Sequence, residues 1–162
     1  MLKLAVIGKD VSESLSPAMH TFILREMGEA CTYDCVSIPP EQFGERAEAL
    51  FERYDAFNVT IPFKTDIMPY LKELKGDAGT FGAVNTVVSA SRAGYNTDGM
   101  GFLLMLGNAG VEVKGKDVLV LGAGGAGRSC IRKLAEAGAN VFAYERSEER
   151  LEEVFKEFGC FT

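Results

Sequence analysis

The chain has 162 residues, enough for one ordinary hydrophobic core or for one small domain plus part of another. With 47% hydrophobic and 25% charged residues, its composition is typical of soluble globular proteins and not of disordered or membrane proteins. Seventeen basic and twenty-three acidic residues give a net charge of −6 without a basic cluster, so nucleic acids and anionic membranes are poor partners.

Strand-like and helical runs alternate from the N-terminus onward. The opening run, MLKLAVIGKD, favours a β-strand over a signal peptide, and no apolar stretch approaches the roughly 20 residues that span a bilayer. The strands we expect lie at 2–8, 31–38, 55–61, 84–89 and 118–121, and in a last run that ends at Glu145. The helices we expect lie at 17–27, at 41–53, after Pro62, at 99–109 and after the glycines of 122–127.

This alternation predicts an α/β fold with a mostly parallel sheet. In the helix expected at 41–53, the apolar residues share one face, and they are Phe43, Ala47, Leu50 and Phe51. The division we expect separates an N-terminal lobe, residues 1–110, from a second unit, residues 111–162.

The segment VLVLGAGGAG is typical of the start of a dinucleotide-binding unit. A strand followed by glycines and a helix places bare backbone amides at a positive helix N-terminus, where a pyrophosphate can bind. Gly122, Gly124 and Gly127 fit the pattern G-x-G-x-x-G, and Gly125 adds conformational freedom to the backbone. The alternative interpretation is a tight turn between strand and helix that binds no nucleotide. Because a complete unit has about six strands and two fit here, we expect an incomplete Rossmann-type unit with the order βαβα.

The segment SESLSP carries more serine than a helix start requires. Ser16, placed before Pro17, suffices as an N-cap that accepts from backbone amides. Ser14 and Ser16 also share one side of an extended stretch, so together they can donate to a ligand carboxylate. This segment alone leaves the two interpretations open.

Two further segments are polar at the ends of expected strands. FNVTIPFK places Asn58 and Thr60 on one strand face, followed by Lys64 at an expected helix start, where the helix dipole disfavours a cation. Such a lysine suits proton exchange, although a surface lysine is the alternative. Further on, Asn85 lies in GAVNT, and Asp98 lies where a strand meets a helix, either as an N-cap or as the partner of Lys64.

The histidine and the cysteines indicate neither a metal site nor a disulfide. His20 is the single histidine, and on a helix it is either structural or in contact with a ligand. The spacing of the cysteines matches no zinc pattern and favours free thiols in a reducing cytoplasm. These cysteines are Cys31, Cys35, Cys130 and Cys160.

Five motifs together resemble one family, in order and at compatible spacing: SESLSPAMH, FNVTIPFK, GAVNT, GYNTDGMGF and LGAGGAG. The family is shikimate dehydrogenase, whose members reduce 3-dehydroshikimate to shikimate in aromatic amino-acid (chorismate) biosynthesis. The resemblance runs from Met1 to about Leu151. It implies that residues 1–110 are a substrate-binding domain and that the protein is a cytoplasmic NADP-linked oxidoreductase.

The resemblance also implies roles for the polar residues. The residues that would contact the substrate are Ser14, Ser16, Asn58, Thr60, Lys64, Asn85 and Asp98. Ser14 and Ser16 would bind its carboxylate, and the asparagines, the threonine and Asp98 its ring hydroxyls. Lys64 and Asp98 would form the catalytic pair, with Lys64 giving a proton to the oxygen at C3 and Asp98 orienting the ammonium.

The cofactor residues depart from the family pattern at one point. Where the family has Asn-Arg-Thr to hold the 2′-phosphate of NADP, this chain has Glu145-Arg146-Ser147, with Arg150 further on. Arg146 and Ser147 suit a phosphate, whereas Glu145 suits the free ribose hydroxyl of NAD. We expect NADP, with NAD as the alternative. The turn residues that would contact the cofactor are Gly122, Ala123, Gly124, Gly125, Ala126 and Gly127.

The remaining cofactor-domain strands of the family, and its C-terminal helix, have no counterpart in the sequence. We therefore expect an N-terminal portion of the enzyme with little activity alone, whose incomplete second sheet favours self-association. The alternatives are a non-catalytic module that binds a shikimate-like acid, and an NAD-linked quinate/shikimate dehydrogenase.

Overall fold

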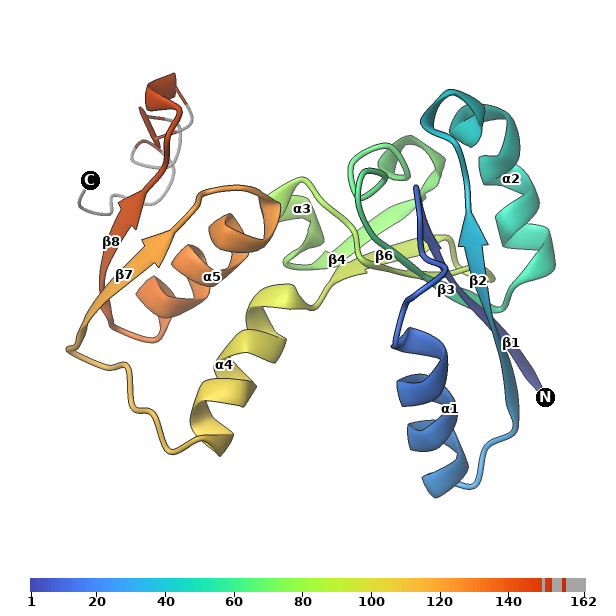
Figure 1. Cartoon of the computed structure of the whole chain (residues 1–162), viewed down its shortest axis with the longest axis horizontal. Coiled ribbons are helices and arrows are strands. Elements are labelled where there is room, and N and C mark those ends of the chain that lie inside the picture. Colours follow the sequence, from blue (N-terminus) through green and yellow to red (C-terminus); the bar gives the residue numbers. More distant parts are fainter. Residues whose placement is uncertain (150, 153–155, 157–162) are drawn as a thin grey trace. The chain divides into compact units, whose positions relative to one another are not determined.

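The computed structural model describes residues 1–149, 151, 152 and 156. It forms two compact units, Met1–Asn96 and Thr97–Thr162 (Figure 1). Among the described residues, no helix is both long and apolar enough to cross a membrane.

A mixed six-stranded sheet forms the first unit, within the described residues. Its strands are β1 (Leu2–Gly8), β2 (Cys31–Ser37), β3 (Ala56–Val59), β4 (Glu73–Gly76), β5 (Thr86–Val88) and β6 (Ala93–Asn96). Its helices are α1 (Ser16–Glu26), α2 (Phe43–Arg53) and α3 (Ala78–Phe81), with 3-10 turns η1 (Pro40–Gln42) and η2 (Met68–Tyr70). The strand order is β2-β1-β3-β5-β6-β4, and β5 alone runs antiparallel to its neighbours.

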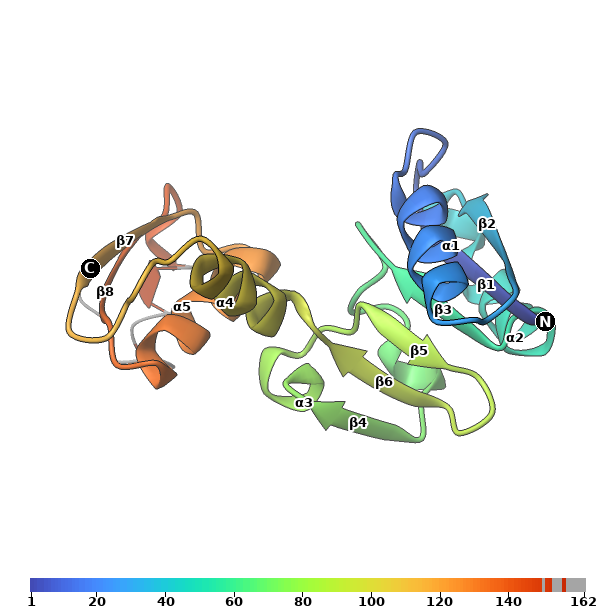
Figure 2. The same ribbon diagram turned by 90° about the horizontal axis from the view of Figure 1, so that it is seen from below.

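The two long helices of this unit lie on opposite faces of the sheet (Figure 2). Right-handed crossovers place them so, because β1 lies between β2 and β3. The apolar face predicted for α2 is confirmed: Phe43, Ala47 and Leu50 are buried in the core, and Phe51 packs against it. Phe43 stacks on the fully buried Phe63, with ring centroids 4.2 Å apart.

The prediction of a short helix directly after Pro62 is wrong. Residues 61–67 form turns, and the 3-10 turn η2 follows them. In an α-helix the carbonyl of Lys64 would accept from the amide of Met68, but it accepts from the amide of Val84 at 2.8 Å. Met68 donates instead to the carbonyl of Thr65. Because Lys64 does not start a helix, the dipole argument for it no longer applies.

The second unit contains helix α4 (Asp98–Asn108), strands β7 (Asp117–Leu121) and β8 (Asn140–Tyr144), and helix α5 (Gly125–Glu136). Helix α4 packs on α5, so the division between the units falls before α4, whereas the sequence places it at residue 110. The contact is close, since a Cβ on Gly99 would meet the side chain of Lys133 at 2.7 Å and the carbonyl of Ser129 at 2.8 Å.

Strands β7 and β8 pair in parallel and bury one face only. On that face, Val118, Val120, Val141 and Ala143 pack in the core of this unit, which includes residues of α5. The opposite face carries Asp117 and Asn140 at one end, and its apolar part, which we call the exposed sheet face, consists of Leu119, Leu121, Phe142 and Tyr144. Leu119 is 62% exposed and Leu121 74%, so the described residues do not give this face the cover that both faces of a parallel sheet usually have.

Candidate functional site

The serine segment lies directly before α1. Both Ser14 and Ser16 are half-buried, and the hydroxyl oxygen of Ser14 accepts from the amide of Ser16 at 3.2 Å. Helix α1 begins at Ser16 itself, and among the described residues no side chain caps it. The interpretation of Ser16 as an N-cap is therefore wrong, while the ligand interpretation still stands.

Asn58 lies in the middle of the sheet, paired with Val6 of β1 on one side and Thr86 of β5 on the other. Asn58 and Thr60 are half-buried and alternate with the buried Phe57 and Val59, as the strand pattern predicts. The side-chain amide of Asn58 donates to the carbonyl of Asn85 at 3.2 Å and to the hydroxyl of Thr86 at 3.1 Å. Its oxygen accepts from the hydroxyl of Tyr33 at 2.6 Å.

Asn85 is held by backbone bonds on both sides. Its amide donates to the carbonyl of Tyr95, and its carbonyl accepts from the amide of Val59, each at 2.9 Å. The oxygen of its side chain accepts from the hydroxyl of Thr86 at 3.0 Å. The structure thus joins Asn58 and Asn85 through Thr86.

Two residues that the sequence did not indicate, Tyr33 and Thr86, belong to this polar cluster. The Tyr33 hydroxyl hydrogen-bonds Ser16 as well as Asn58, and the Tyr33 ring stacks on His20 at 5.0 Å. Burial raises the pKa of Tyr33 to about 12, although the hydrogen bond with Ser16 acts in the opposite direction and lowers this pKa. Burial also lowers the pKa of His20, so the imidazole is favoured in its neutral form.

Lys64 and Asp98 lie in different units. Lys64 is half-buried in the turns after β3, and Asp98 is the half-buried first residue of α4. Asp98 lies near the thiol of Cys130, and burial together with this carboxylate raises the pKa of that thiol. The pairing of Lys64 with Asp98 stays a prediction.

The glycine turn has the geometry that the sequence predicts. Gly122 follows β7 with a φ of 98°, a conformation that favours glycine, and helix α5 begins at Gly125 after Gly124 as N-cap. A Cβ on Gly127 would collide with the carbonyl oxygen of Gly122. Strand, turn and helix therefore place backbone amides at the positive end of a 12-residue helix.

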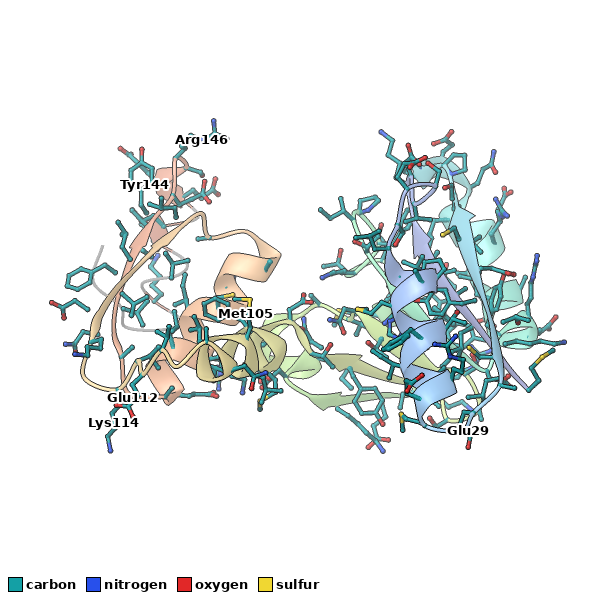
Figure 3. The ribbon with its side chains drawn as sticks, turned by 60° about the horizontal axis from the view of Figure 1, so that its bottom comes forward. Glu29, Met105, Glu112, Lys114, Tyr144 and Arg146 are labelled. Atoms are coloured by element: carbon teal, nitrogen blue, oxygen red, sulfur yellow. The ribbon has the colours of Figure 1, made fainter. Side chains whose placement is uncertain are left out.

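Glu145 lies against this turn. One oxygen of its carboxylate accepts from the amide of Ala123 at 2.9 Å, and the other accepts from the amide of Arg146 at 2.9 Å. The Arg146 side chain is exposed beyond the end of β8 (Figure 3), and Ser147 is half-buried. Arg150 lies outside the described residues.

Metal-binding residues do not gather in the described part of the chain: no three His, Cys, Asp or Glu side chains there are placed to hold an ion. Cys31, Cys35 and Cys130 are free thiols. Cys160 lies outside the described residues.

Comparison with known families gives two matches. Residues 6–87 match the shikimate dehydrogenase substrate binding domain, and residues 86–160 match the C-terminal domain of alanine dehydrogenase/PNT. The chain belongs to the shikimate dehydrogenase family. The family predicted from the five motifs is thereby confirmed, as is the mixed α/β fold with parallel strand pairs.

Individual relatives support the same assignment. The shikimate dehydrogenase (NADP(+)) of Thermus thermophilus is 40% identical over 161 residues, which cover 98% of this chain and 61% of the relative. A crystal structure of shikimate 5-dehydrogenase from the same organism, in complex with NADP(H) and shikimate, has a TM-score of 0.92 at 39% identity. The match covers 99% of this chain and 62% of the chain in that structure. The chain thus spans about three fifths of the length of these relatives.

A more distant neighbour carries a different cofactor. The structure of shikimate 5-dehydrogenase from Listeria monocytogenes in complex with shikimate and NAD has a TM-score of 0.86 at 27% identity. The match covers 99% of this chain and 60% of that one.

Proposed function

We propose that the chain forms the substrate-recognition lobe and part of the cofactor unit of an NADP-linked shikimate dehydrogenase, which interconverts 3-dehydroshikimate and shikimate. The observation that carries this proposal is the polar cluster of the first unit, in which Ser16, Asn58 and Asn85 are linked through Tyr33 and Thr86. Its hydroxyl and amide groups match a polyhydroxylated carboxylate better than they match an apolar ligand. Family membership supports the same substrate class.

Each residue has a distinct role in this proposal. The hydroxyls of Ser14 and Ser16 donate to the substrate carboxylate, while Asn58, Thr60 and Asn85 bind the ring hydroxyls. Lys64 gives a proton to the oxygen at C3 and stabilises the negative charge that develops there. Asp98 orients the Lys64 ammonium and contacts a ring hydroxyl.

The second unit fits the phosphate groups of a dinucleotide. Bound NADP would supply the hydride for the C3 carbon. The backbone of Gly122, Ala123, Gly124, Gly125, Ala126 and Gly127 would hold the pyrophosphate, since no Cβ fits at Gly127 and the amides lie at a helix N-terminus. Arg146, Ser147 and Arg150 would donate to the 2′-phosphate.

One observation favours an NAD-linked variant of the same function. The carboxylate of Glu145 lies between the glycine turn and Arg146, where a negative charge repels a 2′-phosphate and can accept from a free ribose hydroxyl. We retain NADP because Arg146 and Ser147 both offer donors to a phosphate.

Two further proposals concern the state of the protein. The exposed sheet face supports self-association, because a contiguous apolar face is unfavourable in water. The free thiols of Cys31, Cys35 and Cys130 support a reducing, cytoplasmic location.

Substrate recognition is tested by titrating shikimate into the chain while backbone amide signals are followed by NMR. Signals around Ser14, Ser16, Asn58 and Asn85 should shift in a saturable manner. The methyl ester of shikimate, which lacks the carboxylate charge, is the matched control and should bind more weakly. Absence of saturable shifts at these residues would refute the proposal.

Turnover needs a separate experiment, because the chain spans about three fifths of its relatives. A chimera joins it to the remaining C-terminal part of the Thermus thermophilus relative, and NADP reduction is followed with shikimate as substrate. We expect oxidation of shikimate. A chimera that binds shikimate and does not turn it over would favour the non-catalytic module.

A further inference from the structure

A directed chain of hydrogen bonds crosses the candidate substrate residues. The hydroxyl of Tyr33 donates to Asn58 at 2.6 Å, the amide of Asn58 donates to the hydroxyl of Thr86 at 3.1 Å, and this hydroxyl donates to the side-chain oxygen of Asn85 at 3.0 Å. Ser16 adjoins the chain at Tyr33. The donor direction is therefore the same at every link from Tyr33 to Asn85.

This direction fixes which end of each asparagine amide faces which neighbour. A side-chain amide presents an acceptor on one side and donors on the other, and only a neighbouring donor or acceptor decides between the two flips. The backbone carbonyl of Asn85 can only accept, so the amino group of Asn58 must face Asn85 and Thr86, and the oxygen of Asn58 is left to accept from Tyr33. Thr86, having accepted from Asn58, donates its own proton to the oxygen of Asn85.

Tyr33 itself is held in place from two sides. Its ring is parallel to that of His20 within 8°, and its strand is paired in register with β1, which in turn pairs with the strand of Asn58. The pKa of Tyr33, which burial raises to about 12, lies far above neutral pH, so the hydroxyl keeps its proton and can donate to Asn58.

We propose that Tyr33 and Thr86 are positioning residues, which orient the amides of Asn58 and Asn85 for the hydroxylated acid that the candidate site binds. The inference rests on the proposed function for the identity of the ligand. Neither residue needs to touch the substrate for this role. Without the Tyr33 hydroxyl, the oxygen of Asn58 loses its donor, and the Asn58 amide is then held only from the side of Asn85 and Thr86.

The test compares Tyr33→Phe and Thr86→Val with Tyr54→Phe. Thr86→Val removes the hydroxyl of Thr86 and keeps its shape. Tyr54→Phe is the matched control, because Tyr54 also donates a tyrosine hydroxyl to a partner in the same unit, Asp34 at 2.9 Å, outside the polar cluster. Shikimate affinity is measured by calorimetry, thermal stability by circular dichroism, and the side-chain amide signals of Asn58 and Asn85 by NMR.

We expect Tyr33→Phe and Thr86→Val each to weaken shikimate binding by about 3- to 10-fold, the effect of one hydrogen bond. The side-chain signals of both asparagines should move in these variants and stay in place in Tyr54→Phe, whatever the change in stability. A folded Tyr33→Phe protein that binds like Tyr54→Phe and keeps the asparagine signals would overturn the inference. If the unsubstituted chain binds no shikimate, the proposed function fails instead, and the amide signals alone decide the positioning role.

Discussion

The carboxylate of Glu145 accepts a hydrogen bond from the backbone amide of Ala123 at 2.9 Å. Its second oxygen accepts from the backbone amide of Arg146, the residue proposed to bind the 2′-phosphate. A single negative charge therefore lies between the glycine turn and Arg146. Coulomb repulsion between this carboxylate and a phosphate opposes the attraction from Arg146. Glu145 and Arg146 should therefore act on cofactor choice with opposite signs.

Adenosine 2′,5′-bisphosphate and AMP test this choice by calorimetry, because they differ in the 2′-phosphate alone. Arg146→Ala should weaken binding of the bisphosphate by about 1.5–3 kcal/mol, roughly tenfold or more, and leave binding of AMP nearly unchanged. Glu145→Gln should tighten the bisphosphate relative to AMP. Glu148→Gln removes a nearby exposed charge and serves as the control. Equal losses of both nucleotides in Arg146→Ala would show that Arg146 does not contact the 2′-phosphate.

Lys64 is expected to act in the chemical step. In the chimera with the Thermus thermophilus relative, Lys64→Ala should lower kcat by about 10²–10⁴-fold, the usual contribution of a general acid, with a smaller effect on KM. Lys72→Ala, at an exposed position of the same unit, is the control. A Lys64→Ala enzyme that keeps at least about half of the kcat would remove Lys64 from the mechanism.

Ser14 and Ser16 are expected to bind the substrate carboxylate, and Ser14 also accepts from the amide of Ser16 at the start of α1. Each change to alanine should weaken shikimate binding by about tenfold to a hundredfold, since hydrogen bonds to a charged group contribute about 1.5–3 kcal/mol. The control is Ser12→Ala, which loses a 2.8 Å hydrogen bond to Asp10 in the same segment. Variants that melt at lower temperature and bind shikimate normally would assign the serines to the fold alone.

The predictable part of the fold is the part with strong local patterns. The period of α2 and the strand–glycine–helix order at 117–136 predicted these elements within a few residues. Strand β4 and helix α3 were not predicted, because β4 is an edge strand with mostly exposed residues and α3 is about one helical turn. Such short elements carry too few residues for a period to be recognised.

Candidate site residues could be predicted from the sequence only where they lie within one of the motifs. Asn58 and Asn85 follow from their motifs, but Tyr33 lies 25 residues before Asn58, and their contact depends on both β2 and β3 pairing with β1. The turns at 61–67 likewise depend on a distant residue, since the amide of Val84 donates to the carbonyl of Lys64. Alternation along a strand gives the face on which a residue lies, and sheet pairing decides what it meets there.

Gly127 is expected to be required for the glycine turn. A Cβ at this position would collide with the carbonyl oxygen of Gly122, so Gly127→Ala should lower the free energy of unfolding by about 1–3 kcal/mol. Gly124→Ala is the matched control, because Gly124 has a φ of −69° and open space around it. Denaturant unfolding of both variants measures the difference. Equal stability would mean that the turn relaxes without cost.

The exposed sheet face should govern association of the chain. Leu121→Lys places a charge at its most exposed position and should lower the weight-average mass in sedimentation at high protein concentration. Leu104→Lys, on helix α4 at a similarly exposed leucine, is the control. A monomer at every concentration, before any substitution, would refute self-association through this face.

The two units keep separate hydrophobic interiors, and this separation bears on how the family diversifies. The buried residues of the first cluster all lie before Asn96, and the residues of the second all lie after it. An exchange of coding sequence at the junction of Asn96 and Thr97 would leave each interior with its own complement of side chains. Nucleotide preference could then change with the second unit, provided that the incoming unit keeps an aspartate at position 98, which contacts the acid in the proposed function.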